Sequence, residues 1–364
     1  MWLSYPAIEG RAIRAAVVGC GRISRNHFKV LDRLADRIEL AAICDVSPAR
    51  FDAIPWDECP ALDRTAARFT SLQPMLRASQ EGSLGIDLAI LASPSGLHAA
   101  QTIACAGAGL HVMTEKPMAT RWQDALDAVK ACDEAGVRLF VVKQNRFNAT
   151  LQLLKRAIDE RRFGRIFMVN VNVFWQRPQS YYDTDRWRGT WELDGGAFMN
   201  QASHYVDLLD WLIGPIESVQ AMTGTLGRNI EVEDSGVLNV RWRSGAMGSM
   251  NVTMLTFPRN LEGSITVLGE KGSVRIGGLA VNEIQHWEFA DERDYDAAVR
   301  DASYEIPNVY GLGHLPYYEN VIEVLHGRRE PLTDGREGLK SLEVIIAAYL
   351  SARDGRTVSL PLHY

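Results

Sequence analysis

The chain has 364 residues, more than the roughly 250–300 residues at which single hydrophobic cores stop growing, so two domains are expected. Apolar residues make up 46% and charged residues 23%, and the net charge of −6 argues against broad electrostatic binding to nucleic acid or anionic lipid. No stretch approaches about 18 uninterrupted apolar residues and the N-terminus lacks the features of a signal peptide, so we expect a cytoplasmic protein. The five cysteines have neither metal-knuckle nor disulfide spacing. We therefore expect reduced core thiols and no metal site.

Residues 12–143 alternate between strand and helix patterns. Apolar strands are predicted at 12–19, 38–45, 85–92, 110–115 and 137–143, and helices at 23–37, 98–109 and 120–136. Residues 46–84 contain four prolines and receive no assignment. Continuous apolar strands that alternate with helices indicate a doubly wound parallel sheet of the Rossmann type, covered on both faces.

Period-2 patterns dominate after Lys143. Helices are predicted at 148–164 and 335–355, and strands at 166–175, 218–226, 236–245, 246–255, 263–278 and 357–362, with hairpins at Ser244-Gly245 and at 270–272. The predicted fold is therefore α/β: an N-terminal extension (1–11), a Rossmann domain (12–143), and a C-terminal α/β domain with a large, mostly antiparallel sheet (144–364).

The strands of this second sheet carry many apolar residues. Val240, Trp242, Met247 and Met250 predict apolar side chains over much of its surface. One face of such a sheet packs on helices, and the other face packs on another subunit. We therefore expect a homo-oligomer that is buried through the strands between Val219 and Ile276.

The stretch "VVGCGRIS" (17–24) joins the first strand to the first helix. Gly19 permits a tight turn, Gly21 lets the backbone approach a pyrophosphate, and Ser24 replaces the third glycine of the dinucleotide fingerprint. Asp45 ends the second strand, where it can bind the ribose hydroxyls of NAD and repel the 2′-phosphate of NADP. A glycine turn in another kind of α/β protein is the alternative. Other cofactor contacts are expected from Arg22, Ile23, Ser93 and His98, with a helix cap or core histidine as the alternative for His98.

Two further motifs carry reactive side chains. "TEKP" ends the fourth strand at the rim where ligands bind such sheets, and we expect a cis Lys116–Pro117 bond there; a surface salt bridge of Glu115 with Lys116 is the alternative. "GGAFMNQASHYVD" (195–207) is predicted to place Asn200 and His204 on one helical face. Its two glycines, Gly195 and Gly196, allow a close approach. Arg186, Trp187 and Arg188 lie just upstream.

Taken together, "GCGRIS", "EKP" and "GGAFMNQASHYVD" resemble the Gfo/Idh/MocA oxidoreductases, from about Ala12 to Leu362. The resemblance implies an NAD-dependent enzyme in which Lys116 and His204 are catalytic. Many relatives carry aspartate four residues before this histidine, where this chain has Asn200, and a neutral amide cannot act as a base. By the same resemblance Glu115, Lys116, Gln144, Trp187 and Arg188 contact the cofactor.

The segments "MTEKPMATRW", "FVVKQNR", "NVNVFWQRPQ" and "WRGTWELDGGAFMNQASHYVDLLDWLIGP" resemble the WlbA-type branch of UDP-N-acetyl-2-amino-2-deoxyglucuronate dehydrogenases. That resemblance implies oxidation of the sugar C3 hydroxyl to a ketone. It also implies a tetramer, and a downstream aminotransferase in the biosynthesis of a diacetamido-dideoxy-uronic acid for lipopolysaccharide O-antigen.

A UDP-sugar acid needs cationic partners, and residues 143–188 hold ten Lys and Arg against four acids. Lys155, Arg156, Arg161 and Arg162 are expected to decorate a solvated helix end. Arg146, Arg177, Arg186 and Arg188 are the candidates for the pocket. The expected substrate-binding residues are Lys116, Arg146, Arg177, Arg186, Asn200 and His204.

In the expected mechanism the substrate lies between the domains. His204 accepts the hydroxyl proton and Lys116 stabilises the oxygen, unless Lys116 is itself the base. Two other functions stay open. One is a dehydrogenase of the same family that acts on another sugar or a polyol, and the other is a non-catalytic NAD-sensing regulator.

Overall fold

A computed structural model describes residues 5–306 and 311–362. It divides into two compact units, which are described one at a time. The first comprises Met1–Val142 and His314–Leu339, and the second Lys143–Gly313 and Lys340–Tyr364. The sequence analysis assigned all of 144–364 to the second domain, whereas the chain returns to the first unit at His314. It returns because α9 (His314–Leu325) packs against α1 (Ser24–Arg33).

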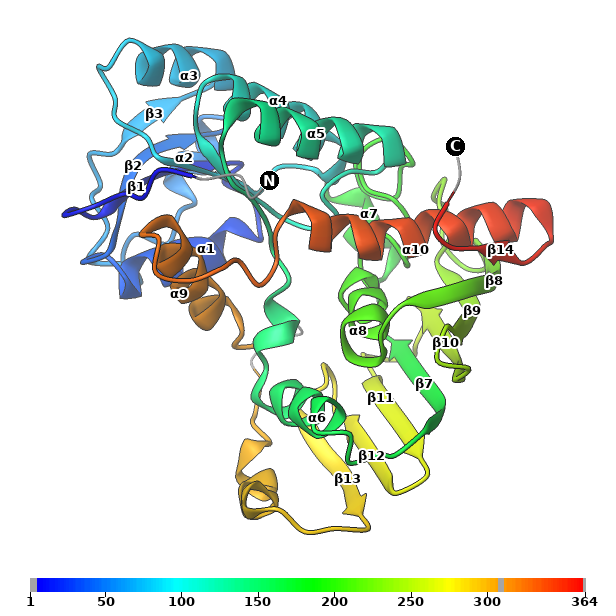
Figure 1. The fold of residues 1–364 in the computed structure, drawn as a ribbon. Helices are drawn as coiled ribbons and strands as arrows, with labels where there is room; N and C mark the ends of the chain where they lie inside the picture. The colour runs from blue at the N-terminus through cyan, green and yellow to red at the C-terminus, as the bar shows by residue number, and fades with distance from the viewer. Residues whose placement is uncertain (1–4, 307–310, 363–364) are drawn as a thin grey trace. The chain divides into compact units, whose positions relative to one another are not determined.

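The first unit is built on a six-stranded sheet with the order β3-β2-β1-β4-β5-β6, in which all neighbours are parallel, as predicted. In Figure 1, α4 and α5 lie on one side of this sheet and α1 and α9 on the other. The strands are β1 (Ile13–Val18), β2 (Ile38–Cys44), β3 (Ala67–Phe69), β4 (Leu88–Leu91), β5 (His111–Thr114) and β6 (Leu139–Val141). Besides α1 and α9 its helices are α2 (Ala49–Asp52), α3 (Leu72–Gln80), η1 (Ser95–Leu97), α4 (His98–Gly107) and α5 (Trp122–Ala135).

Strands β4 and β5 are buried along their whole length, which explains their continuous apolar sequences. The edge strand β3 is not buried in this way, and it lies with α2 and α3 in the stretch 46–84 that had no assignment. All five cysteines are buried and unpaired, as expected.

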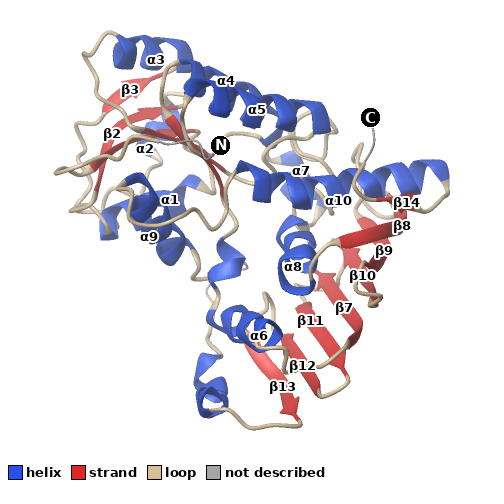
Figure 2. Cartoon of the chain, viewed as in Figure 1, coloured by secondary structure: helices blue, strands red, loops and turns tan. Residues whose placement is uncertain are grey.

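The second unit contains an eight-stranded sheet with the order β13-β12-β11-β7-β10-β9-β8-β14 (Figure 2). Only β7 and β10 pair in parallel, so the prediction of a mostly antiparallel sheet is confirmed, as are the hairpins β9–β10 and β11–β12. The strands are β7 (Ile166–Phe174), β8 (Ile216–Gly224), β9 (Ser235–Trp242), β10 (Met247–Thr253), β11 (Glu262–Gly269), β12 (Gly272–Gly277), β13 (Glu283–Phe289) and β14 (Val358–Ser359). The helices are η2 (Gln144–Phe147), α6 (Ala149–Asp159), α7 (Gln179–Asp183), α8 (Ser203–Ile213), η3 (Asp294–Ala302) and α10 (Gly335–Asp354), of which Lys340–Asp354 belong here.

One face of this sheet packs on helices and is more fully buried than the sequence suggested. Val240, Trp242 and Met250, which were expected to make the sheet surface apolar, are at most 4% exposed. The indole Nε1 of Trp242 donates to the carbonyl oxygen of Leu209 in α8, 3.2 Å away. These side chains therefore belong to the interior, and of the four residues only Met247 is exposed.

The opposite face is polar at its centre and apolar at one end. Asn170 Nδ2 donates to Ser249 Oγ over 2.8 Å between β7 and β10. Met168, Met247 and Leu268 are exposed and face one another in register on three adjacent strands. We call these three residues the apolar row. Among the described residues, no helix is long and apolar enough to cross a membrane.

Candidate active site

The turn between β1 and α1 is shaped for close approach. Gly19 has φ +92°, and a Cβ there would lie 2.7 Å from the main chain of Ala92 and Ser93, so only glycine fits. At Gly21 a Cβ would meet nothing within 4 Å. No side chain caps the start of α1, and Ser24 Oγ instead donates back to Gly21 O at 2.7 Å. The geometry leaves room and backbone dipoles for a pyrophosphate.

Asp45, at the end of β2, holds this turn. Its Oδ2 accepts the N–H of Cys20 and its Oδ1 accepts the N–H of Ser47, both at 2.8 Å. Each carboxylate oxygen has two lone pairs, so one on each remains for ribose hydroxyls. The residues of this rim therefore fit a dinucleotide.

The rim after β4 is fixed by internal hydrogen bonds. Ser93 Oγ donates to Gln101 Oε1 over 2.6 Å. His98 is 1% exposed, and its Nδ1 and Nε2 lie 2.8 Å from Pro117 O and 2.9 Å from Ser93 O. Burial lowers the pKa of His98, against the effect of these two bonds. Both ring nitrogens thus lie beside main-chain carbonyl oxygens, which is the arrangement that the core-histidine alternative describes.

The E-K-P motif follows β5, and the predicted cis Lys116–Pro117 bond is confirmed. Glu115 is only 5% exposed, whereas Lys116 is half-buried. Glu115 Oε1 lies 3.2 Å from His27 Nε2, and its Oε2 accepts the N–H of Lys116 at 3.2 Å. The Glu115 carboxylate is buried inside the first unit, so it is not part of a surface salt bridge, which was the alternative.

Positive partners keep Glu115 ionised. Burial alone would raise its pKa, but the bond to His27 and the charges of His27, Lys116 and His314 outweigh that effect and lower the pKa to about 2. His27 is also bonded through Nδ1 to Tyr318 OH at 2.6 Å. Neither His27 nor Tyr318 was singled out by the sequence analysis.

His204 lies on the first turn of α8 in the second unit and is buried. Its Nε2 is 3.0 Å from the side-chain amide nitrogen of Gln144, a residue expected to contact the cofactor. The prediction that Asn200 and His204 share a helical face is wrong, because α8 begins at Ser203. Asn200 instead lies in the preceding turn, where its Nδ2 donates to Asp194 Oδ1.

A buried ion cluster lies one turn beyond His204. Arg146 donates from Nε and one terminal nitrogen to the two oxygens of Asp207, both at 2.7 Å, and Lys143 Nζ is 3.5 Å from Asp207. Burial would raise the pKa of Asp207, but Lys143 and Arg146 lower it to about 2. Arg146 was expected to bind substrate. The structure gives its guanidinium a carboxylate of its own, because a buried cation needs a partner. The sequence analysis did not single out Asp207, which could have been noticed because it follows His204 by three residues.

The two glycines before His204 do permit a close approach, but by a side chain of the protein itself. A Cβ on Gly196 would lie 1.6 Å from Glu233 Oε2. Glu233 Oε1 accepts the Phe198 N–H at 2.9 Å and the Tyr349 OH at 3.0 Å. Burial raises the pKa of Glu233 to about 7, and these two neutral donors offset it only in part.

The remaining candidates follow β7. Arg188 donates to Asp185 and to Tyr181 OH, with its guanidinium 4.3 Å from the Trp187 ring. Arg177 donates to Gln176 O at 2.6 Å. Arg186 is exposed.

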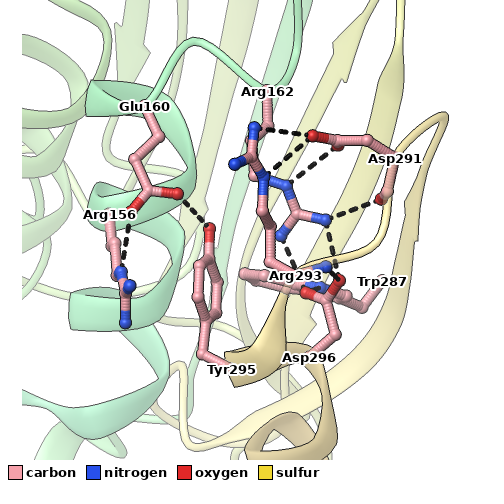
Figure 3. Close-up of polar contacts among 8 residues, drawn as sticks. All are labelled: Arg156, Glu160, Arg162, Trp287, Asp291, Arg293, Tyr295 and Asp296. Carbon is pink, nitrogen blue, oxygen red and sulfur yellow. Dashed lines mark hydrogen bonds and ion pairs between the residues drawn. The ribbon is translucent and has the colours of Figure 1, made fainter.

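Arg162 corrects the expected picture of the basic helix end. It was expected in solvent, yet its side chain is fully buried. Figure 3 shows its guanidinium bonded to Asp291 and Asp296, with the Trp287 indole donating to Asp296 as well. The beginning of η3 is thereby tied to the end of α6. Arg156 pairs with Glu160 beside it, as expected of a surface pair.

Comparisons with known proteins bear on both units. The profile "Oxidoreductase family, NAD-binding Rossmann fold" matches residues 13–143, and "Oxidoreductase family, C-terminal alpha/beta domain" matches residues 155–360. The chain belongs to the Gfo/Idh/MocA oxidoreductase family. The family resemblance seen in the sequence is therefore confirmed, and NAD is the cofactor of this Gfo/Idh/MocA enzyme.

Two solved structures within the family are similar over their full length. The WlbA dehydrogenase from Chromobacterium violaceum, in complex with NADH and UDP-GlcNAcA, is 63% identical with a TM-score of 0.92, covering 100% of both chains. The WlbA dehydrogenase from Bordetella pertussis, with the same two ligands, is 60% identical with a TM-score of 0.92, covering 98% of this chain and 100% of that one. The D-apiose dehydrogenase of Paraburkholderia graminis is 27% identical over 361 residues, 96% of this chain and 90% of that protein.

Among the described residues, no group of three or more His, Cys, Asp or Glu side chains is arranged to hold a metal ion. The candidate proton-transfer groups are Lys116 in the first unit and His204 in the second. A half-buried lysine on a fixed turn can donate to an oxygen. A buried histidine bonded to a neutral amide can accept a proton.

Proposed function

We propose that this enzyme uses NAD to oxidise the C3 hydroxyl of UDP-N-acetylglucosaminuronate to the ketone. The observation that carries the proposal is the 60–63% identity to two WlbA dehydrogenases whose structures hold NADH and UDP-GlcNAcA. The glycine turn, the E-K-P motif and the histidine of α8 support it, because the turn can accommodate the pyrophosphate of NAD and the other two supply a cation and a proton acceptor.

The reaction breaks a C–H and an O–H bond and forms a C=O bond. Bound NAD supplies the acceptor for the hydride. We assign His204 as the acceptor of the hydroxyl proton and Lys116 as the donor that stabilises the negative charge on the same oxygen. The Gln144 amide nitrogen lies 3.0 Å from His204 Nε2; where it donates to that nitrogen, the substrate hydroxyl must displace it before Nε2 can accept the proton.

The negative groups of the substrate need cations that have no buried carboxylate of their own. Arg146 fails this condition because it is paired with Asp207. We therefore propose Arg177, Arg186 and Arg188 as the cations for the diphosphate and carboxylate groups. Asn200 cannot accept a proton, and we assign it to hydrogen bonding with the substrate beside His204.

Three further features of the proposal concern the surroundings of the enzyme. We propose a homotetramer whose subunits pack through the face of the eight-stranded sheet on which the exposed apolar row lies. We propose an aminotransferase as the next enzyme, because a ketone is its substrate, in the formation of an O-antigen sugar. The five buried free thiols suit a reducing cytoplasm.

NADH absorbance with a panel of substrates tests the proposal. The panel contains UDP-N-acetylglucosaminuronate, UDP-N-acetylglucosamine, the uronate without UDP, and free pentoses and polyols. We expect turnover only with the first, and a deuteride reduction of the product should label C3. Faster turnover of a free sugar would favour the polyol alternative. NAD binding without turnover of any compound would favour a regulator.

A further inference from the structure

The catalytic lysine of the proposed mechanism lies between two residues that are each held by a buried histidine. Glu115 precedes Lys116 and is bonded to His27 Nε2 at 3.2 Å. Pro117 follows it, and its carbonyl oxygen is 2.8 Å from His98 Nδ1. The two histidines are 0% and 1% exposed and come from α1 and α4.

His27 is itself fixed from behind. Tyr318 OH lies 2.6 Å from its Nδ1, and the ring of His314 packs edge-on at a centroid distance of 5.9 Å. Both partners belong to α9, the segment that returns to the first unit. His27 can donate Nε2–H to the Glu115 carboxylate while its Nδ1 shares a hydrogen bond with the Tyr318 hydroxyl. The returning helix thus supports the E-K-P turn through one imidazole.

His98 acts from the other side of the turn. Its Nε2 is 2.9 Å from Ser93 O, so the ring spans the distance between the end of β4 and Pro117. A neutral imidazole carries one N–H and can donate to only one of these two carbonyl oxygens. With the proton on Nδ1, movement of Pro117 would break the bond to its carbonyl oxygen, and an unsatisfied buried group costs about 1–3 kcal/mol.

We propose that His27 and His98 are positioning residues that fix the backbone on both sides of Lys116 and thereby aim its ammonium group. The inference rests on the proposed function of Lys116. Neither histidine acts on the substrate, so loss of either should lower kcat by about ten- to a hundredfold, the effect expected of a misplacement near 1 Å. The dissociation constant of NAD should change little.

Paired amide substitutions give the sharpest test, because asparagine places its N–H₂ near the position of Nδ1 and glutamine near that of Nε2. At position 27 the bond to Glu115 comes from Nε2, so His27→Gln should keep more activity than His27→Asn. At position 98 the bond to Pro117 comes from Nδ1, so His98→Asn should keep more activity than His98→Gln. Tyr318→Phe keeps its ring and should lower kcat less than His27→Asn. A purely structural role would give no such crossed order.

The same variants are then combined with Lys116→Met and measured by single-turnover NADH formation. If the histidines act through Lys116, they should cause no further loss in that background. Equal losses in both backgrounds would overturn the positioning role while leaving Lys116 catalytic. Full activity of Lys116→Met alone would instead overturn the catalytic role proposed for Lys116, and loss of turnover of UDP-N-acetylglucosaminuronate by the wild type would overturn the proposed function. If His27→Asn fails to fold, His98→Gln and Tyr318→Phe still decide the question.

Discussion

Two glutamates of this protein, Glu115 and Glu233, are buried to nearly the same extent, at 5% and 3% exposed. The pKa values of their carboxyl groups are nevertheless shifted in opposite directions. The pKa of Glu115 falls to about 2 and that of Glu233 rises to about 7, although burial acts to raise the pKa of both. The difference therefore arises from their partners.

Glu115 has positive neighbours, whereas Glu233 has neutral ones. His27 and the Lys116 side chain stabilise the Glu115 carboxylate. Glu233 accepts hydrogen bonds from a main-chain N–H and a tyrosine hydroxyl, faces the negative charge of Asp234, and has no partner for Oε2 among the described residues. These neutral donors offset the desolvation of the Glu233 carboxylate only in part. Each glutamate supports a different motif, Glu115 the turn of Lys116 and Glu233 the loop before His204.

The largest effect should come from the residues that these two regions present to the substrate. His204→Ala should lower the single-turnover rate of NADH formation by about two to four orders of magnitude, and Lys116→Met should do similar damage. The double variant should be little worse than either, because the pair acts on one hydroxyl group. His286→Ala, on the exposed edge strand β13, is the matched control and should keep full activity. If His204→Ala stays within about threefold of the wild type, His204 is a core histidine.

A second prediction concerns Asp207, a buried carboxylate near His204 that has positive partners, as Glu115 does. Asp207→Asn would leave the Lys143 and Arg146 charges buried without their carboxylate, at a cost of about 3–5 kcal/mol in the free energy of unfolding. Urea denaturation measures this loss. Asp354→Asn, which removes the surface partner of Arg353, is the control and should change stability little. Equal losses in the two variants would show that burial of the ion cluster is unimportant.

The sequence predicted the features that are encoded locally. The glycine turn, the E-K-P bend and the central strands each occupy a few consecutive residues, so spacing and composition were enough to identify them. The cis bond at Lys116 was expected because a proline follows this residue in a tight turn. These local signals also carried the family resemblance.

The sequence could not show which charges pair across long separations. His27 and Glu115 are 88 residues apart, Arg146 and Asp207 are 61 apart, and Arg162 and Asp296 are 134 apart. A count of basic residues therefore placed Arg162 in solvent and did not show the carboxylate partner of Arg146, because it contains no information on partners. The helical face expected for Asn200 failed for a different reason, since α8 starts only at Ser203.

A third prediction concerns the dependence of stability on pH. The pKa of Glu233 is about 7 in the folded protein against 4.5 for an ordinary glutamate, so between these pH values the unfolded chain loses a proton that the folded chain keeps. Stability should therefore fall as pH rises through this window, by about 3 kcal/mol in all. In Glu233→Gln this contribution is absent, and the wild type should lose stability relative to the variant from pH 4.5 to 7.

Glu115→Gln is the mirror-image control. The lowered pKa of Glu115 means that its contribution to stability is present above pH 4.5 and is lost as pH falls toward 2. Urea unfolding of the three proteins across pH should thus give differences with opposite slopes in two separate windows. Parallel curves for the wild type and Glu233→Gln would contradict the raised pKa.

The smallest effect should come from a third carboxylate, Asp45, which is only partly buried and is bonded to two main-chain N–H groups. Asp45→Ala removes the ribose contacts of NAD together with the charge that repels the 2′-phosphate of NADP, so the preference for NAD over NADP should fall by about ten- to a hundredfold. Asp45→Asn separates the two causes, because its amide oxygen can still accept an N–H or hydroxyl hydrogen bond while the charge is gone. Loosening of the glycine turn would weaken both cofactors equally and would leave the ratio unchanged. Binding isotherms for NAD and NADP with each variant give that ratio directly, and a wild type that prefers NADP would show that Asp45 serves only the turn.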